Sequence, residues 1–523
     1  MLGFNPSMPA HPPILLAAVN ARHGHASLGA RCLLANMGVL RPQTALAEFT
    51  VQQSAAEIAQ AIAALNPRIL GLGVYVWNAA LVSALLPLLR TRLPDLLVVL
   101  GGPEIAGPTP PNADFLLLGE GDLAFPALCR DILLAPSPRS RSDFPRAISP
   151  PLPDLSLVQL PYDEYSDSDL AHRTLYVESS RGCAMRCDYC VSSIDPSVRF
   201  FPLPPLLAAF DRLLARGARQ FKFCDRSFNL HVPRAVEILS FFLDRIPSFP
   251  GLFLHLEMLP DRFPPELRAI LSRFPPRSLQ LEIGIQSFNP SVLDTIRRPQ
   301  NLDLAADNLR FLRANTHAFI HADLIAGLPA ESPASFAAGF DRLFSLQPHE
   351  IQLGILKKLP GAPIARHDVA FSMRYSPSPP YPVLSSRDWP ADHLLRTARF
   401  AHWWDAFVSS NRFLAAAPLV WNNAPSVFAA FMEFSDWMGD RFPREHGIPL
   451  AQLLEALFDF LVSVRLIPPE TAADALVRGY RHAGARDLPP ALAPHLRHAP
   501  PPPAQGLSKS LRRQDLFWSW LQA

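Results

Sequence analysis

The sequence predicts an α/β protein with an N-terminal doubly wound, Rossmann-like domain, a partial (β/α)6 barrel and a mainly helical C-terminal domain. Three observations support this prediction. The 523 residues are too many for one hydrophobic core. Short apolar runs alternate with segments of helical periodicity, which favours parallel sheets. Proline-rich breaks separate two such series and precede a third stretch that is helical in pattern.

The first series of strands and helices covers residues 13–135. Its strands are expected at residues 14–19, 45–51, 69–76, 96–100 and 114–118. Helices are expected between them at residues 27–37, 55–65 and 79–93. A doubly wound sheet binds its ligand at the carboxyl ends of its strands. Glycines and polar residues gather directly after those ends, so a ligand site is predicted there.

Residues 136–172 are rich in Pro, Ser, Arg and Asp and are predicted to be a linker. The second series covers residues 173–375 and predicts a partial barrel of the TIM type, with its chemistry at the carboxyl ends of the strands. Its strands are expected at residues 175–179, 220–224, 252–257, 278–285, 318–325 and 350–355. Residues 376–523 form the helical extension, and its tryptophans at helical spacing are expected in a core.

Composition excludes several classes of protein. Charged residues make up 18% of the chain and the formal net charge is +2, so no global field recruits nucleic acid. No apolar stretch approaches the roughly 18 residues of a membrane-spanning helix. The six cysteines are not spread as in a disulfide framework, since three of them lie between residues 183 and 190. We therefore expect a soluble chain in the reducing cytoplasm.

The three clustered cysteines, Cys183, Cys187 and Cys190, follow a predicted strand in a C-x-x-x-C-x-x-C pattern. Three thiolates on one loop can bind three irons of a 4Fe-4S cluster and leave the fourth iron open for a chelating cosubstrate. A zinc site would normally have a fourth Cys or His at matched spacing, and none stands out. A zinc loop or three incidental cysteines are the alternative interpretations.

This spacing, with Tyr189 before the last cysteine, resembles the radical S-adenosylmethionine (SAM) superfamily. Four later motifs resemble its oxygen-independent coproporphyrinogen oxidase-like branch, namely residues 256–257, 284–288, 296–298 and 323–329. The resemblance implies that SAM binds the open iron. It also implies SAM contacts for Tyr189, Glu257, Gln286, Arg298 and Asp323. Carboxylates suit ribose hydroxyls, and a guanidinium suits the methionine carboxylate.

Two residues after the second barrel strand are interpreted separately. Asp225 lies at a predicted strand end, where both a substrate-side role and a structural role in the loop remain open. Cys224 is expected to be a buried strand residue and not a metal ligand.

A doubly wound domain ahead of a radical SAM core resembles the cobalamin-binding radical SAM proteins, and the loops resemble the subgroup with an uncharacterised C-terminal extension. The resemblance implies that cobalamin contacts the strand-end residues. These are Asn20, Arg22, His25, Ser27, Gly73, Tyr75, Trp77, Asn78, Gly101, Gly102, Pro103, Glu104, Gly119, Glu120 and Gly121. Glycines there let the backbone approach a flat ligand closely. A nucleotide-binding domain, or one that binds nothing, is the alternative, although no G-x-G-x-x-G follows the first strand.

The cobalt is not expected to have a histidine ligand. Cobalamin domains that supply one carry the pattern Asp-x-His-x-x-Gly after the first strand, whereas Asn20 stands here in place of the Asp, and Ala26 lies three residues before Gly29. His23 and His25 are thus expected to hydrogen-bond the corrin or its tail. The cobalt would then be faced by Tyr75 or Trp77.

The first hypothesis for the reaction is methylation of an unactivated carbon through a 5′-deoxyadenosyl radical and methylcobalamin. A rearrangement, cyclisation or oxidation without methyl transfer is the second. A cobalamin or redox sensor with a structural cluster is the third, and the SAM motifs argue against it. The resemblance also implies an external electron donor of the flavodoxin or ferredoxin type. The substrate is not identified by the sequence.

Overall fold

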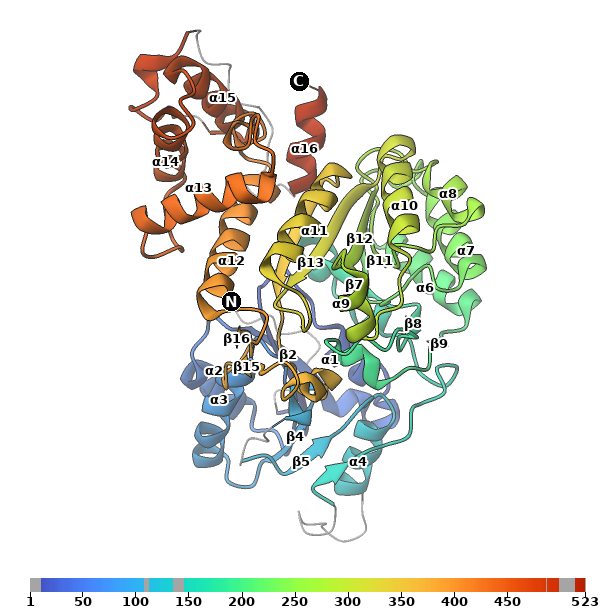
Figure 1. Ribbon diagram of the computed structural model, residues 1–523. Coiled ribbons are helices and arrows are strands. Elements are labelled where there is room, and N and C mark those ends of the chain that lie inside the picture. Colours follow the sequence, from blue (N-terminus) through green and yellow to red (C-terminus); the bar gives the residue numbers. More distant parts are fainter. Residues whose placement is uncertain (1–10, 108–111, 135–144, 486, 498–512, 523) are drawn as a thin grey trace.

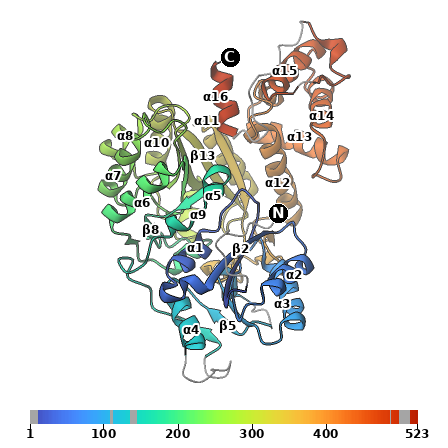
Figure 2. The same cartoon turned by 180° about the vertical axis from the view of Figure 1, so that it is seen from behind.

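Two parallel six-stranded sheets form the framework of the protein (Figure 1). The computed structural model describes residues 11–107, 112–134, 145–485, 487–497 and 513–522. The first sheet lies at one end of the molecule, and the second lies above it beside the C-terminal helices, as the view from behind also shows (Figure 2). The predicted fold class is confirmed.

The first sheet has the strand order β2-β1-β3-β4-β5-β6, and all its pairs are parallel. Its strands are β1 (Ile14–Asn20), β2 (Thr44–Thr50), β3 (Ile69–Gly73), β4 (Leu97–Gly101), β5 (Phe115–Leu117) and β6 (Ala147–Ile148). Its helices are α1 (Leu28–Ala35), α2 (Ala55–Leu65), α3 (Ala79–Arg92) and α4 (Ala124–Leu133). One apolar core joins one face of the sheet to α2 and α3, and another joins the other face to α1 and α4. Every residue of β1 is buried, as expected for a central strand covered on both faces.

The second sheet has the strand order β14-β13-β12-β11-β10-β7 and is also parallel throughout. Its strands are β7 (Leu175–Val177), β10 (Gln220–Phe223), β11 (Phe253–Met258), β12 (Leu279–Gln286), β13 (Phe319–Ala326) and β14 (Glu350–Ile355). Its helices are α6 (Leu203–Ala215), α7 (Val232–Leu243), α8 (Pro265–Leu271), α9 (Pro290–Thr295), α10 (Leu302–Asn315) and α11 (Pro333–Ser345). Strands in sequence order with helical crossovers make a partial barrel whose edges are β7 and β14.

The segment predicted as a linker has more structure than expected. Residues 136–144 lie outside the described residues, but the rest contains β6, a 3-10 turn η4 (Pro161–Glu164) and α5 (Asp167–His172). β6 extends the first sheet by pairing with β5. A strand of two residues is too short to leave a periodic signal, which explains why the sequence suggests only a linker.

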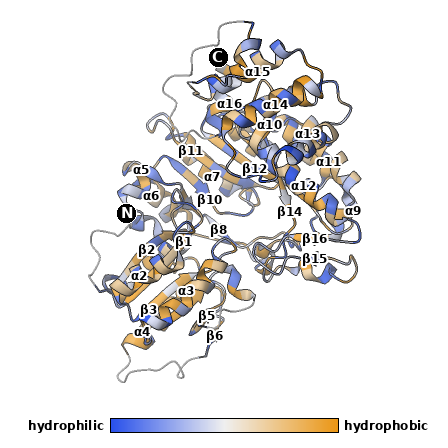
Figure 3. Cartoon of the chain, turned by 90° about the vertical axis from the view of Figure 1, so that its left-hand side faces the viewer, coloured by the Kyte–Doolittle hydropathy of each residue, from blue (hydrophilic) through white to orange (hydrophobic). Residues whose placement is uncertain are grey.

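The C-terminal region packs onto the barrel and shares its hydrophobic core. Its elements are β15 (Arg374–Tyr375), β16 (Val383–Ser385), α12 (Ala391–Trp404), α13 (Val427–Arg441), α14 (Leu450–Ser463), α15 (Pro469–His482) and α16 (Arg513–Gln522). The β15–β16 hairpin crosses the boundary expected between residues 375 and 376. Trp403 and Trp404 are buried in this shared core, as expected of tryptophans at helical spacing. Hydropathy colouring of the chain shows apolar and polar residues side by side on these helices (Figure 3).

A buried group of four charged side chains joins the first sheet to the segment that precedes the barrel. Arg31 of α1 contacts Glu48 of β2 and Asp169 of α5, both at 2.8 Å. Arg173 contacts the same Glu48 at 2.6 Å. Burial alone would raise the pKa of Glu48, but the hydrogen bond and charge of Arg31 lower it to about 2. These ion pairs hold the two sheets in a defined arrangement.

Among the helices of the described residues, none is both long enough and apolar enough to cross a bilayer.

Candidate functional site

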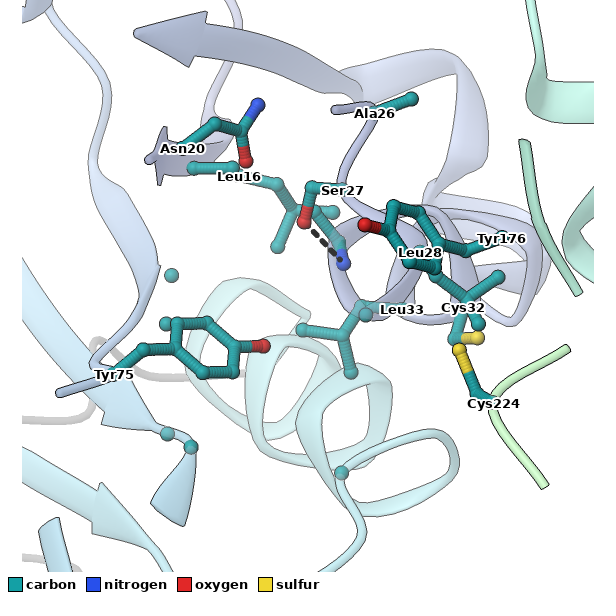
Figure 4. Close-up of a pocket in the computed structure, with 18 of the residues that line it drawn as sticks. Leu16, Asn20, Ala26, Ser27, Leu28, Cys32, Leu33, Tyr75, Tyr176 and Cys224 are labelled. Carbon is teal, nitrogen blue, oxygen red and sulfur yellow. Dashed lines mark hydrogen bonds between the residues drawn. The ribbon is translucent and has the colours of Figure 1, made fainter. Parts of the chain in front are cut away.

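A cavity of about 700 Å³ lies between the carboxyl ends of the two sheets. One wall comes from β1, β3, β4 and the loops that follow them, and it is formed largely by glycines and aliphatic side chains. The other wall comes from the barrel and carries Tyr176, Lys222, Cys224, Arg226 and Glu257. The close-up shows Tyr75 on one side of this space, with Cys32 and Cys224 on the other (Figure 4). A mostly apolar cavity with a few polar groups is the usual form of a small-molecule site.

Most residues predicted to contact cobalamin line this cavity. They are Asn20, His25, Ser27, Gly73, Tyr75, Trp77, Gly101, Gly102, Gly119, Glu120 and Gly121. Gly102 has a backbone φ of +95°, and a Cβ there would lie 2.5 Å from the carbonyl oxygen of Val74. Only glycine therefore fits this turn.

Four of the predicted cobalamin contacts, Arg22, Asn78, Pro103 and Glu104, do not line the cavity. Asn78 is buried and donates to the carbonyl oxygens of Val19 and Gly73, so it holds the loop after β3 in place. Glu104 is buried and accepts a hydrogen bond from Tyr381 of the C-terminal region. Arg22 and Pro103 are exposed. A position at the end of a strand therefore does not distinguish a residue that contacts a ligand from one that supports the loop.

The aromatic and imidazole groups of this wall have defined partners. Tyr75 and Trp77 stack with ring centroids 4.5 Å apart and an interplanar angle of 4°. The Trp77 indole donates to the carbonyl oxygen of Val19. Nδ1 of His25 lies 2.7 Å from the hydroxyl of Tyr176, and burial lowers the pKa of His25 with help from Arg22 and Lys222. His23 is exposed and does not line the cavity.

The cysteine loop follows β7 and is flanked by the short strands β8 (Ser180–Arg181) and β9 (Arg199–Phe200). Cys183 and Cys187 are buried, and Cys190 is partly exposed. Gly182 has a φ of +86°, and a Cβ there would lie 1.9 Å from the carbonyl oxygen of Ser197. The backbone N–H of Cys183 donates to the carbonyl of Asp195 at 3.0 Å. The loop is therefore tightly closed on itself.

Within the described residues, no three His, Cys, Asp or Glu side chains are grouped closely enough to hold a single metal ion.

Asp188, between two of the cysteines, anchors the loop to the chain after β14. Its buried carboxylate lies 2.8 Å from Nε2 of His367 and also contacts Arg366. Both partners belong to the 3-10 turn η6 (Pro363–His367). The backbone N–H of Asp188 donates to the carbonyl of Ile296, next to the Arg motif. The sequence carries no signal for this anchor, since the partners are far apart in the chain.

Arg298, one of the residues predicted to bind SAM, lies against the cysteine loop, and Gln286 lies close to it over Gly284. Nη1 of Arg298 donates to Sγ of Cys187 at 3.5 Å and to the hydroxyl of Tyr189 at 3.1 Å. Its Nη2 donates to the carbonyl oxygen of Gly284. Gln286 follows a bulge in β12 and has a φ of +69°. Its side chain lies over Gly284, where a Cβ would come within 2.3 Å of Nε2.

The two predicted SAM carboxylates lie at different places in the barrel. The side chain of Glu257 lines the cavity. Burial raises its pKa to about 7, and the charge of Arg226 opposes this rise. Asp323 accepts from Nε2 of His321 at 2.9 Å. Burial raises the pKa of Asp323, and His321 opposes that change. Of the predicted SAM and cluster residues, only Glu257 lines the cavity between the sheets.

The structure shows the partners of Asp225 and corrects the expectation for Cys224. Asp225 is buried and accepts from the backbone N–H and hydroxyl of Ser179 and from the hydroxyl of Ser180. These contacts give it a role in holding the loop after β7. Cys224 lies one residue beyond β10, is partly exposed and lines the cavity. The strand ends earlier than expected, which brings this cysteine to the cavity wall.

Sequence reasoning missed most of the barrel wall. Each of five successive strands carries a polar residue within its apolar run, as in Leu-Tyr-Val of β7 and Phe-Lys-Phe of β10. These residues are Tyr176, Lys222, His255, Glu282 and His321. His255 contacts Glu282 at 2.8 Å, and Nδ1 of His321 lies 3.5 Å from Glu350. A repeated polar residue in buried strands is a signal for a polar barrel interior that the sequence does contain.

Several comparisons with known proteins agree with this geometry. The family model of the radical SAM superfamily matches residues 177–343. A 2-(S-pantetheinyl)-carbapenam-3-carboxylate methyltransferase of Streptantibioticus cattleyicolor is 27% identical over 332 residues, which are 57% of this chain and 48% of that protein. The cobalamin-dependent radical SAM methyltransferase TokK of Streptomyces tokunonensis is 24% identical over 507 residues, covering 88% of this chain and 71% of that protein. The chain thus spans about half the length of the first relative.

Solved structures show the same fold at low identity. The radical SAM methyltransferase TsrM from Kitasatospora setae superposes with a TM-score of 0.54 at 15% identity, over 70% of this chain and 79% of that one. The cobalamin-dependent SAM radical enzyme OxsB superposes with a TM-score of 0.58 at 12% identity, over 90% of this chain and 84% of that one. The resemblance to cobalamin-binding radical SAM proteins is confirmed, and the predicted enzyme class and cofactors agree with these relatives.

Proposed function

We propose that this chain, whose residues 177–343 match the radical SAM superfamily, is a cobalamin-dependent enzyme that methylates an unactivated carbon. The observation that carries the proposal is the cavity, because the loops predicted for cobalamin and the barrel residue Glu257 predicted for SAM line the same space. A methyl donor and a hydrogen-abstracting radical must both reach one substrate carbon, and a shared cavity allows this.

Each predicted cofactor is assigned to residues of this chain. Cys183, Cys187 and Cys190 would hold the cluster, with thiolate ligands on a loop closed by Gly182. The glycine-rich loops after β1, β3, β4 and β5 would hold cobalamin, because an almost side-chain-free wall admits a large flat ring. When bound, the cluster supplies the electron that splits SAM into methionine and a 5′-deoxyadenosyl radical, and cobalamin supplies the methyl group.

The protein's own side chains would bind and orient SAM. Arg298, which lies beside Cys187, would pair with the carboxylate of the methionine moiety. Glu257 and Asp323 would accept from hydroxyl groups. His321 supports Asp323 by the hydrogen bond at 2.9 Å. The stacked pair Tyr75 and Trp77 would face the corrin from the first sheet.

An external donor of the flavodoxin or ferredoxin type would supply electrons, and such donors act in the cytoplasm. A radical reaction without methyl transfer uses the same cofactors, and the test below separates it from the proposal.

Anaerobic purification and reconstitution, with iron, sulfide and corrinoid quantified, would test the proposal. With dithionite, the enzyme is expected to form 5′-deoxyadenosine, and Cys183→Ala is expected to form none. Corrinoid-dependent formation of S-adenosylhomocysteine from SAM marks methyl transfer. Formation of 5′-deoxyadenosine with bound corrinoid but no S-adenosylhomocysteine would support a radical reaction of another kind. A cluster that never cleaves SAM would contradict both and favour a sensor.

A further inference from the structure

The charged side chains of the cavity differ in how well they are paired. Arg181 contacts three carboxylates, those of Glu120, Asp122 and Glu178, at 2.7 to 2.8 Å. Its charge is therefore fully engaged within the protein. Two other cations of the barrel wall, Lys222 and Arg226, each have one longer ion pair among the described residues, at 3.9 and 3.4 Å.

Lys222 lies within β10, between two buried phenylalanines. Its side chain is 30% exposed, and Nζ is 3.9 Å from Oε2 of Glu282. That carboxylate already contacts Nε2 of His255 at 2.8 Å. The ammonium group thus reaches the cavity while its nearest counterion is shared and distant. Among the described residues, this is the only ion pair of Lys222.

Arg226 follows β10 and its side chain is 51% exposed, although it lines the cavity. Nη1 lies 3.4 Å from Oε1 of Glu257, longer than the roughly 2.7–2.9 Å of a charge-assisted hydrogen bond. Glu257 is itself assigned to SAM. When SAM occupies that carboxylate, the guanidinium is free to take another anion. The carboxylates of the opposite wall, Glu120 and Asp122, are already paired with Arg181.

We propose that Lys222 and Arg226 form an anion-binding subsite, so that the substrate is a small organic molecule carrying a carboxylate or phosphate group. This inference rests on the proposed function, because it assigns the cavity to the substrate and Glu257 to SAM. Two cations on one strand and its following turn can grip the two oxygens of such a group. A subsite there fixes one end of the substrate beside the SAM residues.

The test uses the full-length enzyme reconstituted with cluster, cobalamin and SAM, and three probes. Phenylacetate and phenyl phosphate carry the two kinds of anion, and phenylacetamide matches phenylacetate in shape without its charge. Calorimetry is expected to show that at least one anion binds about tenfold or more tightly than the amide. Whichever anion is preferred identifies the group.

Four variants make the result specific. Lys222→Met and Arg226→Gln are each expected to lose the preference for the anion, whereas Lys222→Arg is expected to keep it. Arg212→Gln, on the exposed face of α6 and paired with Asp163, is a matched control that keeps it as well. Cobalamin content is measured for every variant, because loss of cobalamin together with the preference would assign the two cations to the corrinoid's own phosphate and overturn the proposal.

The failure of this inference can be told from the failure of the proposed function. A wild-type enzyme that binds corrinoid and forms 5′-deoxyadenosine, yet binds the amide and both anions equally, overturns the anion subsite alone. Retention of the full preference for the anion in both Lys222→Met and Arg226→Gln would also overturn the anion subsite alone. An enzyme that forms no 5′-deoxyadenosine overturns the proposed reaction, whatever the probes do.

Discussion

The guanidinium of Arg298 lies 3.5 Å from Sγ of Cys187, although the two residues are 111 positions apart in the chain. The same group reaches the hydroxyl of Tyr189, so one buried cation touches both a predicted cluster ligand and the aromatic beside it. A permanent positive charge at this place draws a carboxylate toward the predicted cluster. Cosubstrate binding and cluster environment are therefore linked through one side chain.

Replacing Arg298 by Gln is expected to raise the KM for SAM by about 10- to 100-fold, while the iron content stays close to that of the wild-type enzyme. The lost charge-assisted hydrogen bonds are each worth about 1.5–3 kcal/mol. Initial rates of 5′-deoxyadenosine formation at varied SAM measure the effect. Arg297→Gln, its exposed neighbour in the same motif, is the control and should behave like wild type. An unchanged KM in Arg298→Gln would remove this residue from the SAM site.

The affinity for SAM is expected to rise with pH through about 7. Burial raises the pKa of Glu257 to about 7, with Glu282 and Asp323 acting in the same direction and Arg226 and Lys222 against it. Below that pH the carboxyl is protonated and is a weaker acceptor for hydroxyl groups. Because ionisation is unfavourable in the fold, the protein without SAM should lose stability as pH rises through this range.

The measurement is the dissociation constant of SAM on the reconstituted enzyme between about pH 6 and 8. Glu257→Gln cannot ionise and should bind SAM weakly with a flat profile across the same range. A wild-type profile as flat as that of the variant would show that this carboxyl does not contact SAM.

Gly182→Ala is expected to abolish cluster assembly. The new Cβ would lie 1.9 Å from the backbone oxygen of Ser197, at a φ of +86°, so the cysteine loop must open. Iron and sulfide analysis after reconstitution measures the loss. Gly251→Ala is the matched control, because its φ is +83° and nothing lies within 4 Å of the new Cβ. That variant carries only the backbone strain, and equal iron loss in both would mean that strain and not the close contact is responsible.

Arg31→Ala is expected to lower the free energy of unfolding by about 3–5 kcal/mol. The side chain is 3% exposed, and its removal leaves the carboxylates of Glu48 and Asp169 buried with one fewer cation. Chemical denaturation of the purified protein gives the value. Arg41→Ala breaks the pair with Glu164, whose arginine is 37% exposed, and should cost about 1 kcal/mol or less. Similar losses in the two variants would contradict a special role for the buried group.

The fold could be predicted well wherever periodicity is strong. Helix α2 has the expected bounds, and the eleven strands expected from apolar runs all form, with ends shifted by a few residues at most. Short elements were missed because two or three residues carry no period, as in β6 and the β15–β16 hairpin. Helices α12 to α16 form within the region predicted to be a helical extension.

The candidate site was predictable where the backbone conformation requires a particular residue type. Gly102 and Gly182 are conspicuous because only glycine fits their backbone geometry. Asn78 and Glu104 look like ligand contacts in the sequence but serve the fold, because their partners Val19 and Tyr381 are brought to them only by tertiary structure. Lys222 was missed although its signal, a lysine between two phenylalanines of a predicted strand, is present in the sequence.

The buried group of Arg31, Glu48, Asp169 and Arg173 also bears on how the two sheets can move. Pulling the first sheet away from the segment before the barrel would break the contacts of Arg31 with Asp169 and of Arg173 with Glu48, while Arg31–Glu48 and Arg173–Asp169 would stay paired. These two cross-contacts oppose a hinge opening between the sheets. We therefore expect ligands to reach the cavity with the sheets in place.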